Sequence, residues 1–165
     1  MVDGQVIANP KGIFRRDRLG QSTTPTEVTV ERGRIRFFSE VLGESNPIHF
    51  DVAEARALGY PDIVAPPSFF MVIEADADKD RAARGEVGGL EFIGADFRYL
   101  LHGSERYDYH GLIFAGDTVS FSMKVDDFYD KKGGAMEFVQ LGFSIVHAER
   151  GLLVSGTRTL LHRLG

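Results

Sequence analysis

Residues 68–84, SFFMVIEADADKDRAAR, follow the pair Pro66-Pro67 and predict the helix around which the fold is built. Proline is tolerated in the first turn of a helix, so the pair marks a helix start. Residues 69–73 are apolar on every side, and the segment then changes to alternating acids and bases. We therefore expect a helix that is buried around its circumference only in its first half. This pattern is typical of a helix embedded in a curved sheet, with its far end in solvent.

The second half of the chain carries the pattern of strands. Residues 119–126 alternate between apolar and polar side chains, and residues 139–145 repeat the alternation. A period of two is typical of strands with one buried face. We expect further strands at residues 90–99, 105–110 and 152–163, with turns at residues 131–134 and 149–151. Helices first and a meander of strands later predict an α+β fold with an antiparallel sheet.

Two further helices are predicted before residue 60. Residues 30–42 carry apolar side chains at helical spacing. Thr29 is a candidate cap for the start of this helix, and Gly43 is placed to end it. Residues 52–58 predict a second, shorter helix that Gly59 closes.

The link between these helices carries an acid and a base. The stretch FFSEVLGESNPIHFD, residues 37–51, places Glu44 and His49 five residues apart. A helix would put them on diverging faces. Pro47 disfavours helical geometry at Asn46, so a turn is expected instead. A turn can direct an acid and a base at one point, which is what proton movement during addition or loss of water requires.

The composition is that of one ordinary globular domain. The chain has 165 residues, of which 43% are hydrophobic and 26% charged. A net charge of −5 and a pI of about 5.5 argue against a broad nucleic-acid-binding surface. Cysteine does not occur, which excludes disulfides, thiolate catalysis and cysteine-ligated zinc.

The start of the chain, MVDGQVIANPKG, lacks the apolar core of a signal peptide. No apolar run approaches the roughly 20 residues that span a membrane. We therefore expect a cytoplasmic protein that does not insert into membranes. Residues 1–26 show no clear periodicity and are interpreted either as an arm that wraps the domain or a partner subunit, or as a partly ordered terminus. Residues 27–165 are interpreted as a single domain.

Two motifs resemble those of a known family. Residues 43–51, GESNPIHFD, resemble the hydratase signature Gly-Asp-x-Asn-Pro-x-His-x-Asp of the MaoC-like family of hot-dog-fold proteins. Residues 107–119, YDYHGLIFAGDTV, look like the Pro-Val-x-x-Gly-Asp-Thr segment at a strand start in that family. The order of elements agrees over about residues 27–163. Residues 65–69, APPSF, and a long insertion holding His102 are most similar to the subfamily that resembles the dehydratase domain of large fatty-acid synthases, which often forms one half of a paired hydratase.

The resemblance implies an antiparallel sheet wrapped around a long central helix, and a homodimer or a heterodimer with another hot-dog chain. It implies a 2-enoyl thioester of coenzyme A or acyl carrier protein as substrate, hydrated to a 3-hydroxyacyl thioester of R configuration. His49 would take a proton from water, and Glu44 would hold that water and protonate the α-carbon. Metal and redox cofactors are not needed. The substrate-binding residues implied are Asn46, bracing the turn, Ser68 at the helix start, and Phe69 and Phe70 along the acyl channel.

Two departures from the family pattern keep an alternative open. The family has aspartate where this chain has Glu44, and a shift of about 1 Å in a catalytic group can cost on the order of 100-fold in rate. Pro67 lacks the N–H that helps to hold the thioester oxygen in active hydratases. Both favour a non-catalytic subunit that binds acyl chains or stabilises a catalytic hydratase partner. A thioesterase would instead need a carboxylate on the long helix, near Glu74 or Asp76.

Several of these residues also have ordinary structural interpretations. The two phenylalanines are more often core than channel. Asp51 is interpreted as the cap of the following helix rather than as an orienting partner of the histidine. His102 and His110 lack a third ligand at convincing spacing and are interpreted as surface or strand residues rather than metal ligands. Arg98 and Arg106 either bind coenzyme phosphates or lie at strand ends without a ligand.

Overall fold

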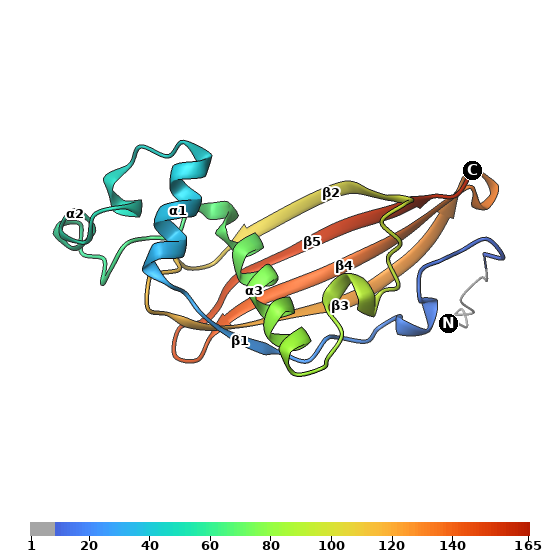
Figure 1. The fold of residues 1–165 in the computed structure, drawn as a ribbon, viewed down its shortest axis with the longest axis horizontal. Helices are drawn as coiled ribbons and strands as arrows, with labels where there is room; N and C mark the ends of the chain where they lie inside the picture. Colours follow the sequence, from blue (N-terminus) through green and yellow to red (C-terminus); the bar gives the residue numbers. More distant parts are fainter. Residues whose placement is uncertain (1–8) are drawn as a thin grey trace.

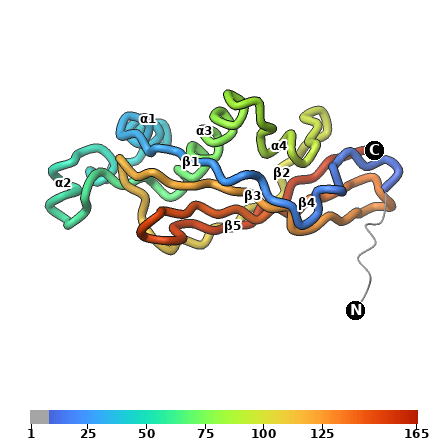
Figure 2. Tube along the Cα trace, turned by 90° about the horizontal axis from the view of Figure 1, so that it is seen from below, coloured from blue at the N-terminus to red at the C-terminus, as the bar shows by residue number. Residues whose placement is uncertain are grey.

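The computed structural model describes residues 9–165, which form one antiparallel sheet with helices on one side (Figures 1 and 2). The five strands are arranged in the order β1-β3-β4-β5-β2. The predicted α+β class is confirmed, with α3 packed across the sheet as its central helix. The elements are β1 (Thr26–Thr29), α1 (Arg32–Leu42), α2 (Val52–Ala57), α3 (Phe70–Ala83), α4 (Gly89–Phe92), β2 (Leu100–Tyr109), β3 (Thr118–Lys131), β4 (Met136–His147) and β5 (Gly151–Arg163).

The core lies between α3 and the inner face of the sheet. The period-two pattern of β3 is confirmed, because its apolar residues from Val119 to Val125 are buried while the residues between them are half-buried or exposed. Strand β4 repeats this arrangement, with Val139 to Ile145 facing the helix. The predicted turn between these strands is a short 3-10 helix at Lys132–Gly134. Within residues 9–165, no helix is both long and apolar enough to cross a lipid bilayer.

The start of the central helix is as predicted, but its burial is not. A 3-10 turn at Pro67–Phe69 leads directly into α3. The buried side chains of α3 form one stripe from Phe70 to Arg81 at helical spacing, while Met71 in the first turn is 53% exposed. The expectation of a half-buried, half-solvated helix was therefore wrong. The stripe continues to the last turn because Arg81 donates to the carbonyls of Thr24, in the segment before β1, and of Phe121 on β3.

The first helix begins two residues later than predicted. Val30 pairs with the start of β3, since its N–H donates to Asp117 and its carbonyl accepts from Gly116. Those bonds hold Val30 in extended backbone, so α1 starts at Arg32 and Thr29 does not cap it. Gly43 ends α1 as predicted, in the left-handed conformation with φ of 72°.

The segment at residues 90–99 is not a strand. Asp78 on α3 accepts hydrogen bonds from the N–H of Gly89 at 3.0 and 3.1 Å, which fixes the start of the short helix α4. Phe92 at the end of α4 is buried, so its apolar residues pack as a helical turn. Strand β2 begins only at Leu100 and forms an edge of the sheet.

Residues 9–25 run along the far end of the sheet before β1 begins (Figure 1). Phe14 is buried and stacks on His162 with the ring centroids 3.9 Å apart. The carboxylate of Glu137 accepts from the N–H groups of Ile13 and Phe14 at 2.6 and 3.0 Å. This part of the predicted arm thus packs on the domain itself, and its first eight residues lie outside the described residues.

Candidate active site

The predicted turn is a short 3-10 helix at Pro47–His49, held by caps on both sides. The side chain of Asn46 accepts the N–H of Ile48 at 3.2 Å and so caps the turn. Asp51 accepts the N–H of Ala53 at 2.7 Å, which confirms its interpretation as the cap of α2. His49 is therefore carried by a turn whose backbone is fixed before and after it.

The orientation of His49 suits a proton acceptor. The side chain is 7% exposed, and its Nδ1 lies 2.7 Å from the carbonyl oxygen of Val64. A carbonyl can only accept, so Nδ1 carries a hydrogen, and in the neutral imidazole the lone pair is then on Nε2. Among residues 9–165, no hydrogen-bond partner of Nε2 is found. The imidazole is thus held in the tautomer that can act as a general base.

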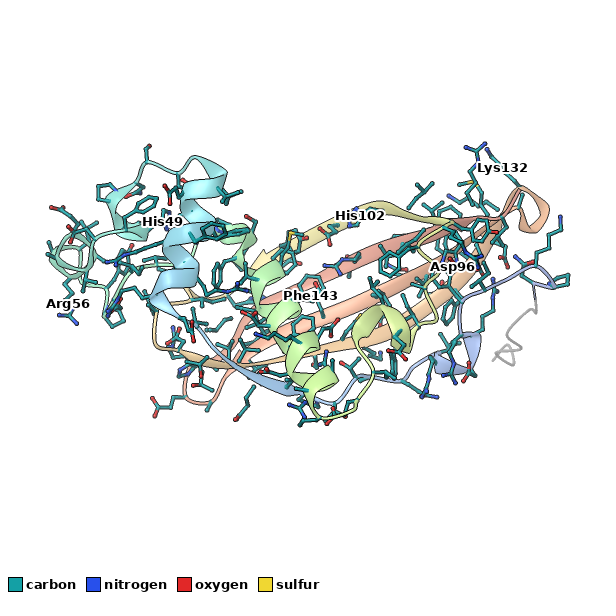
Figure 3. The ribbon with its side chains drawn as sticks, viewed as in Figure 1. His49, Arg56, Asp96, His102, Lys132 and Phe143 are labelled. Atoms are coloured by element: carbon teal, nitrogen blue, oxygen red, sulfur yellow. The ribbon has the colours of Figure 1, made fainter. Side chains whose placement is uncertain are left out.

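His49 lies on the wall of a cavity of about 430 Å³. Tyr109, at the end of β2, donates its hydroxyl hydrogen to the carbonyl oxygen of Pro67 at 2.9 Å and so joins β2 to the start of the central helix at this cavity. Figure 3 shows His49 at the end of the molecule formed by α1 and α2, away from His102 on β2. The apolar part of the wall includes Ile48, Val64, Pro67, Leu112, Ile113 and Val154.

Glu44 is not among the residues that line this cavity. It is half-buried in the link after α1, where its N–H donates to the carbonyl of Ser39 at 2.9 Å. Within the described part of the chain, its carboxylate makes no hydrogen bond or ion pair. The structure therefore brings His49 to the cavity and leaves Glu44 outside the wall.

The three residues at the start of the central helix differ in their roles. Phe69 and Phe70 lie in the hydrophobic core, where Phe69 packs edge-on against Phe38 and Phe70 stacks on Phe143. The N–H of Phe69 donates to Pro66 at 2.9 Å. The N–H of Ser68 has no acceptor among the described residues and lies at the positive end of the helix, although Ser68 itself does not line the cavity of His49.

Two features of the cavity gave no clear signal in the sequence. The carbonyl of Val64 orients the imidazole, but a backbone acceptor leaves no mark in the residue type. Tyr109 lies inside the second motif, yet only the packing of β2 against the start of the central helix brings its hydroxyl to Pro67.

The carboxylates considered for thioesterase chemistry are both held in ion pairs. Glu74 accepts two hydrogen bonds from Arg158 at 2.8 and 2.7 Å. Asp76 accepts one from Arg34 at 2.7 Å. Neither carboxylate lines the cavity of the histidine, so the structure gives no support to a thioesterase site on α3.

The other candidate polar residues are engaged elsewhere. His102 lies 3.2 Å from Glu105, and His110 is hydrogen-bonded to Ser155 at 2.9 Å. No cluster of three or more potential metal ligands occurs within residues 9–165. The two arginines considered for coenzyme phosphates pair with nearby acids, Arg98 with Asp96 at 2.6 Å and Arg106 with Asp108 at 3.2 Å.

An ion pair between α1 and the segment that leads to the cavity residue Val64 predicts acid sensitivity. Arg32 binds Asp62 with two hydrogen bonds of 3.0 and 2.6 Å, and this contact holds the pKa of Asp62 below its usual range. A lowered pKa stabilises the fold above the unfolded-state pKa of about 3.9, and this contribution is lost as the pH falls through the folded-state pKa. We expect Asp62→Asn to lower the free energy of unfolding at pH 6 by about 1 kcal/mol. The loss is small for a charged pair, because solvent around half-exposed Arg32 weakens its attraction to Asp62.

Urea unfolding at several pH values measures this effect. The stability difference between Asp62→Asn and the unmodified protein should disappear as the pH is lowered from 5 to below 3. Asp76→Asn, which removes the more exposed pair with Arg34, serves as the matched control and should change stability less. A difference for Asp62→Asn that stays constant with pH would contradict the ionic explanation.

The antiparallel sheet packed on a central helix is a hot-dog fold. The chain matches the family described as "FAS1-like, dehydratase domain region" over residues 17–151 and belongs to that family. The predicted resemblance to MaoC-like hot-dog proteins is thereby confirmed at the level of family and fold.

Curated relatives and solved structures agree with this assignment. A UPF0336 protein of Leifsonia xyli subsp. xyli is 34% identical over 145 residues, which are 87% of this chain and 92% of the relative. The C-terminally truncated HadBC complex of Mycobacterium tuberculosis, a (3R)-hydroxyacyl-ACP dehydratase, has a TM-score of 0.69 at 21% identity, covering 88% of this chain and 97% of that one. A MaoC-like dehydratase of Rhodospirillum rubrum has a TM-score of 0.67 at 15% identity, with 93% and 99% covered. At these identities the structural likeness shows the fold.

Proposed function

We propose that this protein is an (R)-specific enoyl-thioester hydratase and 3-hydroxyacyl-thioester dehydratase, with His49 as its general base. The observation that carries the proposal is the buried imidazole on the wall of an apolar cavity, with Nδ1 bound to Val64 and Nε2 free. The substrate would be the enoyl thioester of coenzyme A or acyl carrier protein, and the protein would act in the cytoplasm.

The proposed reaction adds the elements of water across the 2,3 double bond. His49 takes a proton from water at Nε2 while the hydroxide oxygen bonds to carbon 3. The electrons of the double bond move to the thioester oxygen, and the resulting enolate takes up a proton at carbon 2. Developing negative charge is stabilised at the positive end of a helix. The free N–H of Ser68 supports that role, because Pro67 has no N–H and that of Phe69 is already bonded.

Glu44 is proposed to hold the water and, as a protonated carboxylic acid, to donate a proton to carbon 2. The proton that His49 has taken from water then returns to Glu44 and restores both groups. Glu44 does not line the cavity in this structure, so its carboxyl group is not placed at the reacting atoms. We therefore expect Glu44→Gln to lower kcat for hydration by about tenfold, less than a directly positioned acid or base, which contributes 10²–10⁴-fold. Steady-state hydration of crotonyl-CoA measures this effect. A loss of 100-fold or more would place the carboxylate at the reacting atoms, and an unchanged rate would remove Glu44 from the mechanism.

The edge strand β2 supports a proposal about oligomeric state. Within residues 9–165 it pairs only with β5, and its ten residues leave a second edge unpaired. Leu101 and Tyr109 on this strand are each 49% exposed. An exposed edge with apolar side chains favours pairing with another strand, so we propose a homodimer or a heterodimer with another hot-dog chain.

The rival function is a non-catalytic subunit that binds acyl chains or supports a catalytic partner. It is favoured by the position of Glu44 outside the wall and by Pro67 at the helix start. The experiment is hydration of crotonyl-CoA by the purified chain alone, with its molar mass measured by light scattering. Activity of the isolated chain supports the enzyme. Activity that appears only with an added hot-dog chain bearing the aspartate motif, and that survives His49→Ala in this chain, supports the rival.

A further inference from the structure

Two cavities lie along the paired strands β2 and β5, one at the turn before α3 and the other beside α3 itself. The cavity of His49 includes Tyr109 and Val154, which face each other across β2 and β5. A second cavity of about 380 Å³ includes Glu105 and Arg158, which form a facing pair further along the same two strands. Both cavities reach residues of the segment from Pro67 to Asp78. The two cavities therefore follow one another along the same pair of strands.

Tyr107 on β2 lies between the two cavities. It faces Gly156 on β5, midway between the pairs just described. Its ring centroid lies 4.3 Å from that of Phe70 on α3 and 5.6 Å from that of Phe143 on β4. Gly156 has no room for a side chain, because a Cβ there would collide with the ring of Phe143. Figure 3 shows Phe143 next to α3. The contacts of Tyr107 with Phe70 on the helix and Phe143 on the sheet therefore place aromatic rings between the two cavities.

A charged network holds the tyrosine in this position. Its hydroxyl donates to Glu105, which is also bound by Arg158. Arg158 in turn makes two hydrogen bonds to Glu74 on the helix. Burial and the bond to Glu105 raise the pKa of the Tyr107 hydroxyl, so it stays protonated as a donor at neutral pH. The network also places half-buried charged groups on the wall of the second cavity, which disfavours contact with an apolar chain there.

We propose that Tyr107 is the specificity-determining residue that ends the acyl site and restricts the proposed hydratase to short acyl chains. This inference rests on the proposed function for the identity of the ligand. A chain that enters past His49 and Tyr109 meets the ring of Tyr107 before it can reach the second cavity. Removing the ring would join the two cavities into one longer channel.

The test compares Tyr107→Ala with Tyr107→Phe. Hydration is measured with four-carbon and twelve-carbon enoyl-CoA, and binding is measured separately with saturated butyryl-CoA and lauroyl-CoA. Each newly buried methylene strengthens an apolar interaction by about fourfold. We expect Tyr107→Ala to raise the preference for twelve over four carbons by at least tenfold in both measurements. Tyr107→Phe keeps the ring and loses only the hydroxyl, so its preference should remain within about twofold of the unmodified protein.

Three outcomes decide the inference. A shifted preference in Tyr107→Ala but not in Tyr107→Phe supports it, and Tyr107→Leu replaces the alanine variant if that variant does not fold. An unmodified protein that already accepts twelve carbons as well as four, or an unchanged preference in every variant that folds, overturns it. If no variant catalyses hydration but Tyr107→Ala still shifts the chain-length preference in binding, the enzyme proposal is refuted. Tyr107 then limits chain length in an acyl-binding subunit.

Discussion

Replacing His49 with alanine is expected to lower kcat for hydration of crotonyl-CoA by about 10³-fold, in the middle of the range for a positioned general base. The reason is geometric. The bond from Nδ1 to Val64 leaves Nε2 as the only imidazole nitrogen able to accept a proton, and the apolar wall offers no replacement. The effect should fall on kcat more than on KM, because the substrate contacts of the wall remain.

A second variant separates catalysis from folding. His49 is buried, so alanine also removes a hydrogen bond and leaves the Val64 carbonyl without its donor. His49→Asn can restore a donor to that carbonyl but carries no basic nitrogen, and it should be as inactive as the alanine variant. His110→Ala, which changes an exposed histidine bonded to Ser155, is the matched control and should stay fully active. Substantial activity in a folded His49→Asn variant would contradict the assignment.

Local sequence patterns correctly predicted the elements whose geometry is set by residues close to them in the sequence. The start of the central helix follows from Pro66-Pro67, and the end of α1 follows from Gly43, because both residue types act through their own backbone angles. The buried face of β3 follows from strict alternation. Asn46 and Asp51 were identified as turn and cap residues for the same reason, since each bonds to an N–H within three positions.

The features that depended on distant partners could not be predicted in this way. Val30 lost its helical conformation to bonds with the start of β3, 86 to 87 positions further along the chain. Residues 90–99 became a helix and turns because Asp78 caps Gly89. The separation of Glu44 from the cavity wall depends on how the turn enters the fold, and the spacing of the motif does not encode it. The same limit applies to Arg81, whose charge predicted a solvated helix end.

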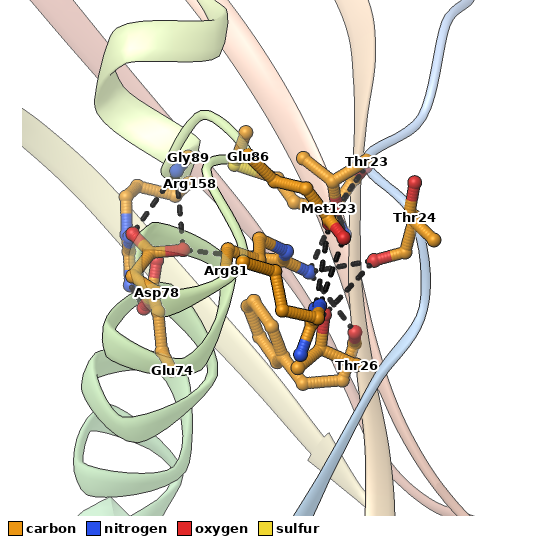
Figure 4. A network of polar contacts seen from close by, with 12 residues as sticks. Thr23, Thr24, Thr26, Glu74, Asp78, Arg81, Glu86, Gly89, Met123 and Arg158 are labelled. Atoms are coloured by element: carbon orange, nitrogen blue, oxygen red, sulfur yellow. Dashed lines mark hydrogen bonds and ion pairs between the residues drawn. The ribbon is translucent and has the colours of Figure 1, made fainter.

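Arg81 is instead the most deeply buried charge on α3, at 1% exposure (Figure 4). Its guanidinium donates to Asp78 at 2.7 Å, to the carbonyl of Thr24 at 2.9 Å and to that of Phe121 at 3.3 Å. These acceptors come from the helix, the segment before β1, and β3. One side chain therefore fastens the end of the central helix to the far edge of the sheet.

Arg81→Ala is expected to lower the free energy of unfolding by about 3–5 kcal/mol, since removing one member of a buried ionic network leaves the other groups uncompensated. Arg84→Ala is the matched control, one turn later on the same helix end. Arg84 is exposed, pairs with exposed Glu86 at 2.8 Å and donates to the Thr26 hydroxyl at 3.3 Å, so its loss should destabilise the fold much less than the loss of Arg81. Urea unfolding of both variants measures the difference.

A replacement that keeps the volume of Arg81 identifies the cause of the loss. Arg81→Met retains an apolar stem over Phe121 but supplies no donor to the carbonyls of Thr24 and Phe121. If the hydrogen bonds dominate, methionine should recover only the packing part and remain destabilised by more than about 1 kcal/mol, the cost of leaving buried acceptors unpaired. Stability equal to that of the unmodified protein would show that the stem alone holds the helix, and that the buried charge contributes nothing to the fold.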